Sequence, residues 1–345
     1  MMYSLLFVAF ITMTFFCAHL QSNELDKETL EWCSAIKGSP EPDLLYYNRI
    51  PKCASSTMLD LFRAVAREHG RVIAYDLDKS LWSDRPSLLL QQELYKDVNE
   101  RIFKPSTKLV FNSHTGYFPY NTSSIKYHKT IEQTQVLREC ESRQISHFFY
   151  DIYGVLPAKR AALAHNSSRF MQKKLELSSD TEVVPCLRSE RCLANVIRPD
   201  IKSNWIATYM GGCSSSSNIG QCRDTSHQAA ALVSENIKPT GVYKTFGMSE
   251  HLYEYLEMLE CVYPTMLRGI VKIYGKRKKL RINKQNTSGY NVETMSIVSK
   301  LAVDKCAKSS DDYIYHNLIN NSFWRRHAAV KIAPYLCCRK RKDIR

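Results

Sequence analysis

The sequence predicts a single α/β domain built around a central, mostly parallel sheet that is flanked by helices. The main observation is a set of apolar runs, each followed by a loop and then by a segment with helical periodicity. The second observation is the size of the chain, because 345 residues with 44% hydrophobic composition suffice for one large domain or two modest ones. This composition excludes a wholly disordered chain.

The folded body is expected to begin with the apolar, aromatic run at residues 44–50, which is typical of a buried strand. Residues 57–69 then repeat apolar side chains at helical spacing, and residues 71–75 are typical of a second strand. Further strands are predicted at 108–112, 135–138 and 241–247, and further helices at 89–102, 143–153 and 249–262. Ser249 is the expected N-cap of the last helix.

The chain is expected to start with a membrane-targeting segment at residues 1–22. Residues 3–20 are apolar and uncharged, and their length is just enough to cross a bilayer as a helix. This segment is either an uncleaved signal anchor, which we favour, or a cleaved signal peptide. Residues 23–44 are polar and are interpreted as a short stem, so the main domain is assigned to 45–335 and a basic tail to 336–345.

The cysteines agree with an oxidising compartment. Of the twelve cysteines, Cys186/Cys192 and Cys213/Cys222 form closely spaced pairs, which are expected to be disulfides. Neither pair has the clustered Cys and His ligands of a zinc site, so no metal is expected. Sequons for N-glycosylation stand at Asn121, Asn166, Asn286 and Asn320.

The net charge points to an anionic partner. Lys and Arg number 48 against 34 Asp and Glu, which gives a formal net charge of +14. Such an excess suits nucleic acid, anionic lipid or an acidic glycan, although a basic protein without any anionic partner has the same composition. A nucleic-acid binder conflicts with the secretory leader and the cysteine pairs, so no nucleic acid is expected.

The strongest chemical signal lies at residues 47–57, where a strand, a loop of small residues and a helix follow one another. The free backbone N–H groups at the start of such a helix bind phosphate. Lys52 adds a positive charge, and Ser55, Ser56 and Thr57 add hydroxyl donors. The Walker A pattern is absent, which disfavours a nucleotide triphosphatase. By local chemistry alone, a plain turn with a helix cap explains the segment equally well.

Residues 48–57, Asn-Arg-Ile-Pro-Lys-Cys-Ala-Ser-Ser-Thr, resemble the 5'-phosphosulfate loop of the uronyl 2-O-sulfotransferases. That family includes heparan sulfate 2-O-sulfotransferase and dermatan/chondroitin uronyl 2-sulfotransferase. The resemblance implies a P-loop-like sulfotransferase fold and the donor 3'-phosphoadenosine 5'-phosphosulfate (PAPS). It also implies that Lys52 contacts the 5'-phosphate and the bridging oxygen of the donor. The residues that it assigns to the loop are Lys52, Cys53, Ala54, Ser55, Ser56 and Thr57.

Residues 136–149 are similar to a second element of the family, in which a strand ends at an Arg and a Ser follows eight residues later. The resemblance therefore implies that Arg138 and Ser146 bind the 3'-phosphate of the donor, since a guanidinium and a hydroxyl can meet on one phosphate. The family usually has Asp-Pro directly after the Arg. In this chain the pair is Glu139-Cys140.

His114 is the candidate general base. A lone histidine is more often structural than catalytic, but His114 follows a predicted strand and stands where the family carries its catalytic histidine. A neutral imidazole can accept the proton of a sugar hydroxyl as that hydroxyl attacks sulfur. The family often has a second histidine two residues earlier, and in this chain Asn112 occupies that position.

The resemblance covers roughly residues 45–300 and includes the basic tract at 276–284. This tract is either a solvated face or a surface that neutralises a polyanion. Arg49 and Arg281 are the residues that we expect to contact the acidic sugar, because guanidinium groups suit bidentate contacts with carboxylates.

The resemblance implies a sulfotransferase that acts on a uronic acid 2-hydroxyl of heparan, dermatan or chondroitin sulfate, without a metal and as a homo-oligomer. With the N-terminal segment as an anchor, we expect a single-pass type II Golgi membrane protein with a lumenal catalytic domain. The alternative is a catalytically weak or inactive glycan-binding relative of the same fold. Asn112 and the Glu139-Cys140 pair are the departures that keep this alternative open.

Overall fold

The computed structural model describes most of the central sheet and many of its covering helices. The described residues are 25–50, 53–70, 72–76, 96, 108–113, 130–153, 206, 210–211, 226–281, 292–307 and 310–340. The segment at 1–22, nearly all of the expected helix at 89–102 and residues 341–345 lie outside them. None of the helices within these ranges is long and apolar enough to span a membrane.

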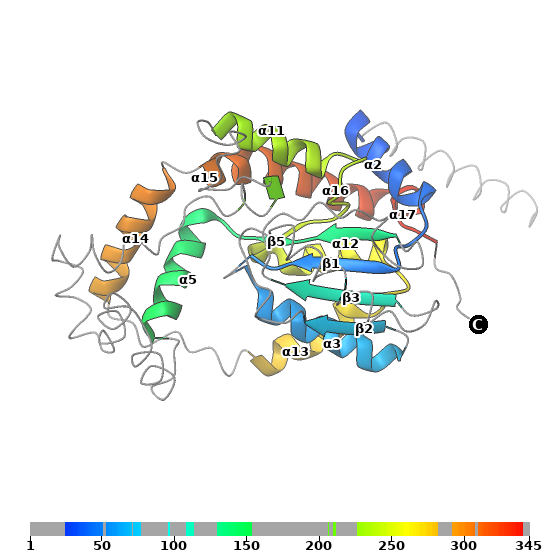
Figure 1. Cartoon of the computed structure of the whole chain (residues 1–345), viewed down its shortest axis with the longest axis horizontal. Coiled ribbons are helices and arrows are strands. Elements are labelled where there is room, and N and C mark those ends of the chain that lie inside the picture. The colour runs from blue at the N-terminus through cyan, green and yellow to red at the C-terminus, as the bar shows by residue number, and fades with distance from the viewer. Residues whose placement is uncertain are drawn as a thin grey trace, which may run out of the picture.

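The core is a four-stranded parallel sheet in the order β2-β3-β1-β4 (Figure 1). Its strands are β1 (Leu44–Asn48), β2 (Val72–Asp76), β3 (Lys108–Ser113) and β4 (Ile131–Thr134). All five residues of β1 are buried, which explains why its sequence is a nearly continuous apolar run instead of an alternating one. The predicted α/β fold with a central parallel sheet is confirmed.

A second parallel pair continues this sheet architecture. β5 (Val136–Leu137) pairs with β6 (Gly247–Met248), and Tyr243 forms an isolated bridge to Gln133. The strand predicted at 241–247 is therefore wrong in extent. The chain still turns at Gly241, whose N–H donates to the carbonyl of Lys238.

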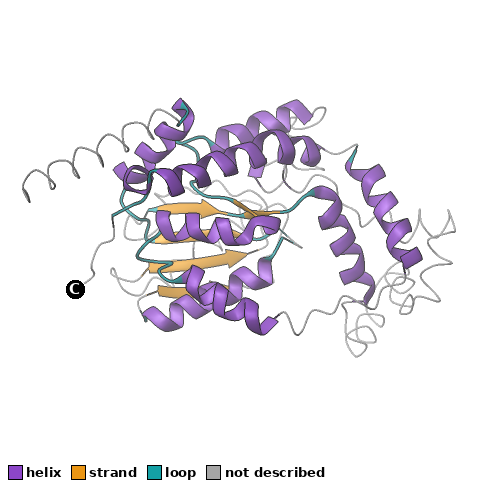
Figure 2. Ribbon diagram, turned by 180° about the vertical axis from the view of Figure 1, so that it is seen from behind, coloured by secondary structure: helices purple, strands orange, loops and turns teal. Residues whose placement is uncertain are grey.

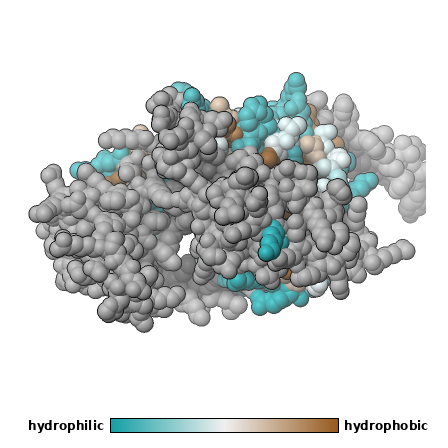
Figure 3. Space-filling view, in the orientation of Figure 1, coloured by the Kyte–Doolittle hydropathy of each residue, from teal (hydrophilic) through white to brown (hydrophobic). Residues whose placement is uncertain are grey.

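The helices form a layer over one face of the sheet. α3 (Ser55–His69) connects β1 to β2, and it lies with α12 (Leu252–Val262) and α13 (Ile270–Arg281) in front of the strands in Figure 2. The other described helices are α2 (Lys27–Gly38), α5 (Cys140–Tyr153), α11 (Ser226–Ile237), α14 (Val292–Cys306), α15 (Ser310–Ile314), α16 (Asn321–Ile332) and α17 (Pro334–Cys337). The surface seen over α2, α11 and α16 is mainly hydrophilic (Figure 3), because their apolar faces turn toward the core.

The predicted N-cap at Ser249 is wrong. Ser249 opens a short 3-10 turn (Ser249–His251), and α12 begins only at Leu252 without a side-chain cap. The Ser249 hydroxyl is buried and has no hydrogen-bond partner in the structure. The α-helical part therefore begins three residues later than predicted.

The segment expected to be a polar stem contains a helix that belongs to the folded body. In α2, Trp32 and Ile36 are fully buried, and Cys33 forms a disulfide with Cys337. Asp26 caps the helix by accepting a hydrogen bond from the Thr29 N–H at 2.8 Å. Residues 27–38 are therefore packed into the folded body, although they precede the domain boundary expected at residue 45.

The expected basic tail also begins inside the body. Arg339 is only 6% exposed, and its Nη2 lies 2.5 Å from Glu132 Oε1. A second disulfide, Cys261–Cys338, fastens the neighbouring residue to α12. Arg339 also donates hydrogen bonds to the carbonyls of Ile36 and Val262. Because a buried charge must be paired, these contacts show that the chain around Arg339 is part of the folded body.

Gly247 is a position where the fold needs glycine. A Cβ added there would overlap the ring of Tyr255, which is fully buried and hydrogen-bonded to Thr134 Oγ1 at 2.6 Å. We expect Gly247→Ala to lower the free energy of unfolding by about 1–3 kcal/mol, because the ring has no room to move. Gly275→Ala is the control, since nothing lies within 4 Å of its added Cβ. Denaturant unfolding that showed equal effects of the two changes would contradict this prediction.

Candidate functional site

The carboxyl ends of the strands lie along one edge of the sheet. β1 and β3 are neighbours with Asn48 opposite Ser113, and the connections that leave them run in opposite directions, to β2 and to β4. In open parallel sheets, ligands bind at such a reversal. Residue 113 directly precedes the candidate base His114, which lies outside the described residues together with Lys52.

The loop between β1 and α3 is shaped by local contacts. Ala54 adopts a left-handed conformation with φ of 55°, which few residues other than glycine tolerate. Its neighbour Ser55 donates a hydrogen bond from Oγ to the carbonyl of Ile50 at 2.8 Å. No side chain caps the start of α3, so its first amide groups keep the positive end of the helix dipole for an anion.

The predicted loop residues differ in burial and in which of their groups could reach a phosphate. Ser55 is buried and its hydroxyl proton is used inside the loop, so its backbone N–H is the group suited to a phosphate. Ser56 is exposed and Thr57 half-buried in the first turn of α3. Cys53 is fully buried.

Arg138 follows β5 at the same edge of the sheet. Its Nε lies 3.7 Å from Glu250 Oε1, and both side chains are about one-third exposed. The other oxygen of Glu250 accepts a hydrogen bond from the Tyr315 hydroxyl at 3.0 Å. Burial, followed by the charge of Glu250, raises the pKa of Tyr315 well above its ordinary value, so Tyr315 stays a neutral donor.

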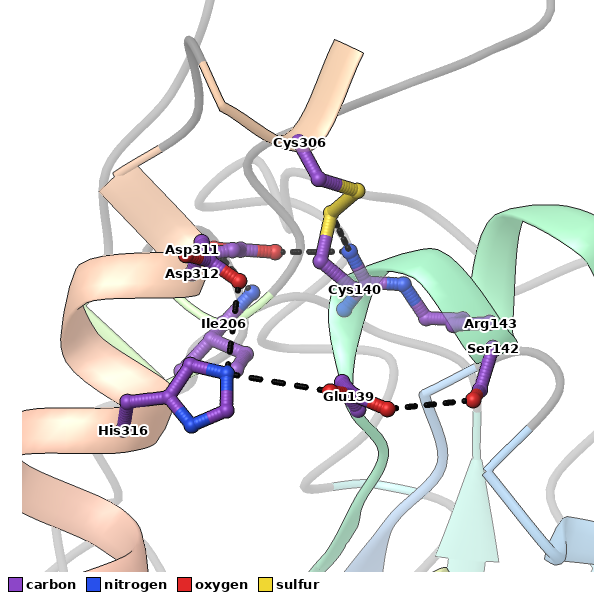
Figure 4. The surroundings of a disulfide bond; sticks show 9 residues. All are labelled: Glu139, Cys140, Ser142, Arg143, Ile206, Cys306, Asp311, Asp312 and His316. Atoms are coloured by element: carbon purple, nitrogen blue, oxygen red, sulfur yellow. Dashed lines mark hydrogen bonds and ion pairs between the residues drawn. A yellow bond between two sulfur atoms is a disulfide. The ribbon is translucent and has the colours of Figure 1, made fainter. Parts of the chain in front are cut away.

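Arg143, on the first turns of α5, makes a buried ion pair. Its Nη2 lies 2.9 Å from Asp311 Oδ2, and neither side chain is more than 2% exposed. Asp311 also accepts a hydrogen bond from the Ile206 N–H at 2.8 Å. The Nε and Nη1 groups of Arg143 have no hydrogen-bond partner in the structure. Figure 4 shows this pair beside the Cys140–Cys306 disulfide.

The loop and the Arg138 element influence each other electrostatically. Burial raises the pKa of the Cys53 thiol to about 12, while the charges of Arg143 and Arg138 lower it. Glu250 and Asp311 raise it further. β4 pairs with β1, and β5 follows β4 after a single residue, so the loop after β1 and the element after β5 start from neighbouring parts of the fold.

These groups fit two phosphates. One subsite has the uncapped amino end of α3, and the other has Arg138 together with the buried, partly unpaired guanidinium of Arg143. Unpaired N–H donors in a buried position suit the oxygens of a phosphate group. Ser146, the other predicted ligand, is half-buried on α5.

Arg49, which was expected to contact the sugar, is held inside the protein. It is 8% exposed, and its Nη1 donates a hydrogen bond to Asn112 Oδ1 at 3.0 Å. Asn112 is 1% exposed. This contact links the ends of β1 and β3 directly beneath the candidate site, and contact of Arg49 with a sugar stays a prediction.

Several other predicted positions are not tested by the structure. Asn320 lies half-buried in the π-helix η6 (Tyr315–Asn320). Within the described residues, no group of three or more His, Cys, Asp or Glu side chains could hold a metal ion. The side chain of Arg281 lies outside what the structure describes. The predicted positions that lie wholly outside the described residues are Cys186, Cys192, Cys213, Cys222, Asn121, Asn166 and Asn286.

The sequence analysis missed the acidic partners of the site. Glu250, Asp311 and Tyr315 come from segments far along the chain, and Asp311 lies 168 positions after Arg143. The one local signal was Cys140, a cysteine inside the element that was predicted to bind the 3'-phosphate, and its disulfide partner Cys306 marks the segment that supplies Asp311.

Comparison with known proteins gives distant but consistent relatives. No protein-family model matches the sequence. Heparan sulfate 2-O-sulfotransferase 1 of Homo sapiens and of Pongo abelii are each 22% identical over 291 residues, which cover 84% of this chain and 73% of the relative. The Gallus gallus protein of the same name is 21% identical over 288 residues, 83% of this chain and 72% of the relative. This similarity supports a sulfotransferase.

Proposed function

We propose that this protein is a glycosaminoglycan sulfotransferase that transfers a sulfuryl group from PAPS to a uronic acid 2-hydroxyl. The acceptor would be heparan sulfate or dermatan/chondroitin sulfate. The observation that carries the proposal is similarity to heparan sulfate 2-O-sulfotransferases over 84% of the chain. Two features of the structure also support the proposal: the start of α3 has no side-chain cap, and Arg138 follows β5, which comes directly after β4, the neighbour of β1.

The donor would be held at both ends by groups of this chain. Lys52 and the amide groups of residues 53–57 would bind the 5'-phosphate, while Arg138 and Ser146 would bind the 3'-phosphate. Charge-assisted hydrogen bonds of this kind fix geometry as well as affinity. Holding donor and acceptor in line removes much of the entropic barrier to transfer.

His114 would act as the general base. Its neutral imidazole would accept the proton of the sugar hydroxyl while the hydroxyl oxygen forms its bond to sulfur. The bond between sulfur and the bridging oxygen breaks, and negative charge gathers on the 5'-phosphate that leaves. Lys52 and the amino end of α3 would stabilise that charge.

The proposed location is the Golgi lumen, with the chain anchored as a type II membrane protein by its N-terminal segment and assembled as a homo-oligomer. The disulfides Cys33–Cys337, Cys140–Cys306 and Cys261–Cys338 suit an oxidising compartment. The net charge of +14 suits an acidic polysaccharide. Basic residues of the 276–284 tract, with Arg281 among them, would meet the polymer.

A glycan-binding protein without turnover is the second candidate. The observation that favours it is Asn112, which stands where the family often has a second histidine. Its side chain is buried and accepts a hydrogen bond from Arg49. Asn112 therefore supports the strand ends, and its amide cannot act as an acid or a base as a histidine would.

Transfer of radiolabel from PAPS to desulfated heparin or desulfated dermatan tests the proposal. We expect the wild-type protein to label the polymer, and Arg138→Ala to raise the KM for PAPS about tenfold through loss of a charged hydrogen bond. Arg67→Ala, on the exposed far end of α3, is the control and should leave KM unchanged.

The outcomes separate the candidates. Labelled polymer whose disaccharides carry the sulfate at the uronic acid 2-position would support the proposed reaction. Binding of the polymer without any transfer of label would support the second candidate. A wild-type protein that binds neither PAPS nor the polymer would contradict both.

A further inference from the structure

The first turn of α5 is fastened to residues 306–316 by links of different chemical kinds. Cys140 forms a disulfide with Cys306 at the end of α14. Arg143 forms the buried ion pair with Asp311, and Glu139 lies 3.8 Å from His316 in an exposed ion pair. Figure 4 shows these groups around the disulfide, and α5 and α14 lie side by side in Figures 1 and 2.

On the α5 side, these links lie between the two proposed 3'-phosphate ligands in the sequence. Arg138 is two residues before Cys140, and Ser146 is three residues after Arg143 and so lies on the neighbouring turn of the same helix face. Arg138 itself contacts Glu250, and Glu250 accepts a hydrogen bond from Tyr315, which follows α15. Cys306 and Asp311 therefore contact the first turn of α5, and Tyr315 contacts Glu250, the ion-pair partner of Arg138.

The links differ in expected strength. The Glu139–His316 pair is almost half exposed, so solvent screening leaves it little weight. The Arg143–Asp311 pair is buried, and the disulfide is covalent, so these two fix the position of α5 relative to the end of β5. Ligand groups need placement to about half an ångström to act together on one anion.

Cys140 also changes how the start of α5 is defined. The family that the sequence resembles has proline at this position, and proline favours the first turn of a helix because its φ is already fixed. A cysteine has no such restriction. In this chain the disulfide to Cys306 therefore constrains the first residue of α5 from outside the helix.

We propose that Cys306, Asp311 and Tyr315 form a clamp that positions Arg138 and Ser146 on the 3'-phosphate of the donor, with Cys140–Cys306 as its covalent part. Cys140, Cys306, Asp311 and Tyr315 are positioning residues, since they act through Arg138 and Ser146. This inference rests on the proposed function and adds residues to which the sequence resemblance assigned no role.

The decisive comparison uses the full-length protein and two nucleotides. The affinity of each variant is measured by calorimetry for adenosine 3',5'-bisphosphate and for adenosine 5'-monophosphate, which lacks the 3'-phosphate. We expect Cys140→Ser with Cys306→Ser to lose about tenfold in affinity for the bisphosphate and to bind the monophosphate unchanged, since only one charged contact is disturbed. In transfer assays KM for PAPS should rise by a similar factor while kcat changes little.

Two further variants make the test specific. Cys140→Pro with Cys306→Ser should recover most of the bisphosphate affinity, because proline restores the constraint at the first turn of α5. Cys33→Ser with Cys337→Ser removes a disulfide between α2 and α17. It should lower thermal stability without changing the ratio of the two nucleotide affinities. Tyr315→Phe keeps all three disulfides of the described residues and should lose about threefold in bisphosphate affinity through one hydrogen bond.

Each outcome has a definite meaning. A wild-type protein that does not prefer the bisphosphate would contradict the proposed function itself. A wild-type preference that persists unchanged in both Cys140→Ser/Cys306→Ser and Tyr315→Phe would overturn the clamp alone. Equal loss in the Cys33/Cys337 control would show a general effect of stability and would also overturn it.

Discussion

Replacement of His114 by alanine is expected to lower kcat about 10²- to 10⁴-fold, which is the usual contribution of a general base. The affinity for adenosine 3',5'-bisphosphate should remain nearly unchanged, because the proposed nucleotide ligands are Lys52, residues 53–57, Arg138 and Ser146. The measurements are initial rates of sulfuryl transfer at saturating PAPS and calorimetric titration with the nucleotide.

His69→Ala is the matched control for this change. Its ring nitrogen lies 2.8 Å from the carbonyl of Arg268 near the end of α3 that faces away from the loop after β1. The control variant should keep its turnover. Undiminished turnover in His114→Ala would refute the assigned base, and equal losses in both variants would show that a general disturbance was measured.

Asp311→Ala is expected to lower the free energy of unfolding by about 3–5 kcal/mol, because it leaves the buried Arg143 guanidinium without its counter-charge. Both side chains of the pair are buried, and Nε and Nη1 of Arg143 have no hydrogen-bond partner that could compensate for the loss of Asp311. Asp311 also supplies the acceptor for the Ile206 N–H, so its loss leaves a second buried donor unsatisfied.

The adjacent residue provides the control. The Asp312 side chain is 40% exposed, and its Oδ1 lies 3.5 Å from His316 Nε2. Because solvent screens such an exposed pair, Asp312→Ala should change the free energy of unfolding by less than about 1 kcal/mol. Both values come from denaturant titration under oxidising conditions that keep the disulfides closed. A loss for Asp311→Ala no greater than that for Asp312→Ala would show that Arg143 finds another partner.

Local patterns in the sequence were enough to predict the centre of the fold. The apolar runs at 44–50 and 108–112 became the neighbouring strands β1 and β3, and the helical spacing at 57–69 became α3. These predictions hold because strands buried on both faces and amphipathic helices leave a periodic signal. The loop after β1 and the Arg138 element also start from neighbouring parts of the fold, because β4 pairs with β1 in parallel and β5 follows β4 directly.

The remaining features depend on contacts between distant segments. Trp32 and Ile36 form a short buried stripe in an otherwise polar segment, so the composition of residues 23–44 indicated a stem. Arg339 looked like part of a basic tail because its partner Glu132 is 207 residues away. Disulfide pairing leaves no pattern in a single sequence, so Cys140–Cys306 could not be predicted.

The disulfide between α2 and α17 has a consequence for biosynthesis. Cys33 is made 304 residues before its partner Cys337, an interval of about 15–60 s at ordinary rates of translation. During that time its thiol is exposed to other cysteines of the growing chain. Production of the correctly bonded protein should therefore depend on a disulfide isomerase that can undo early mispairing.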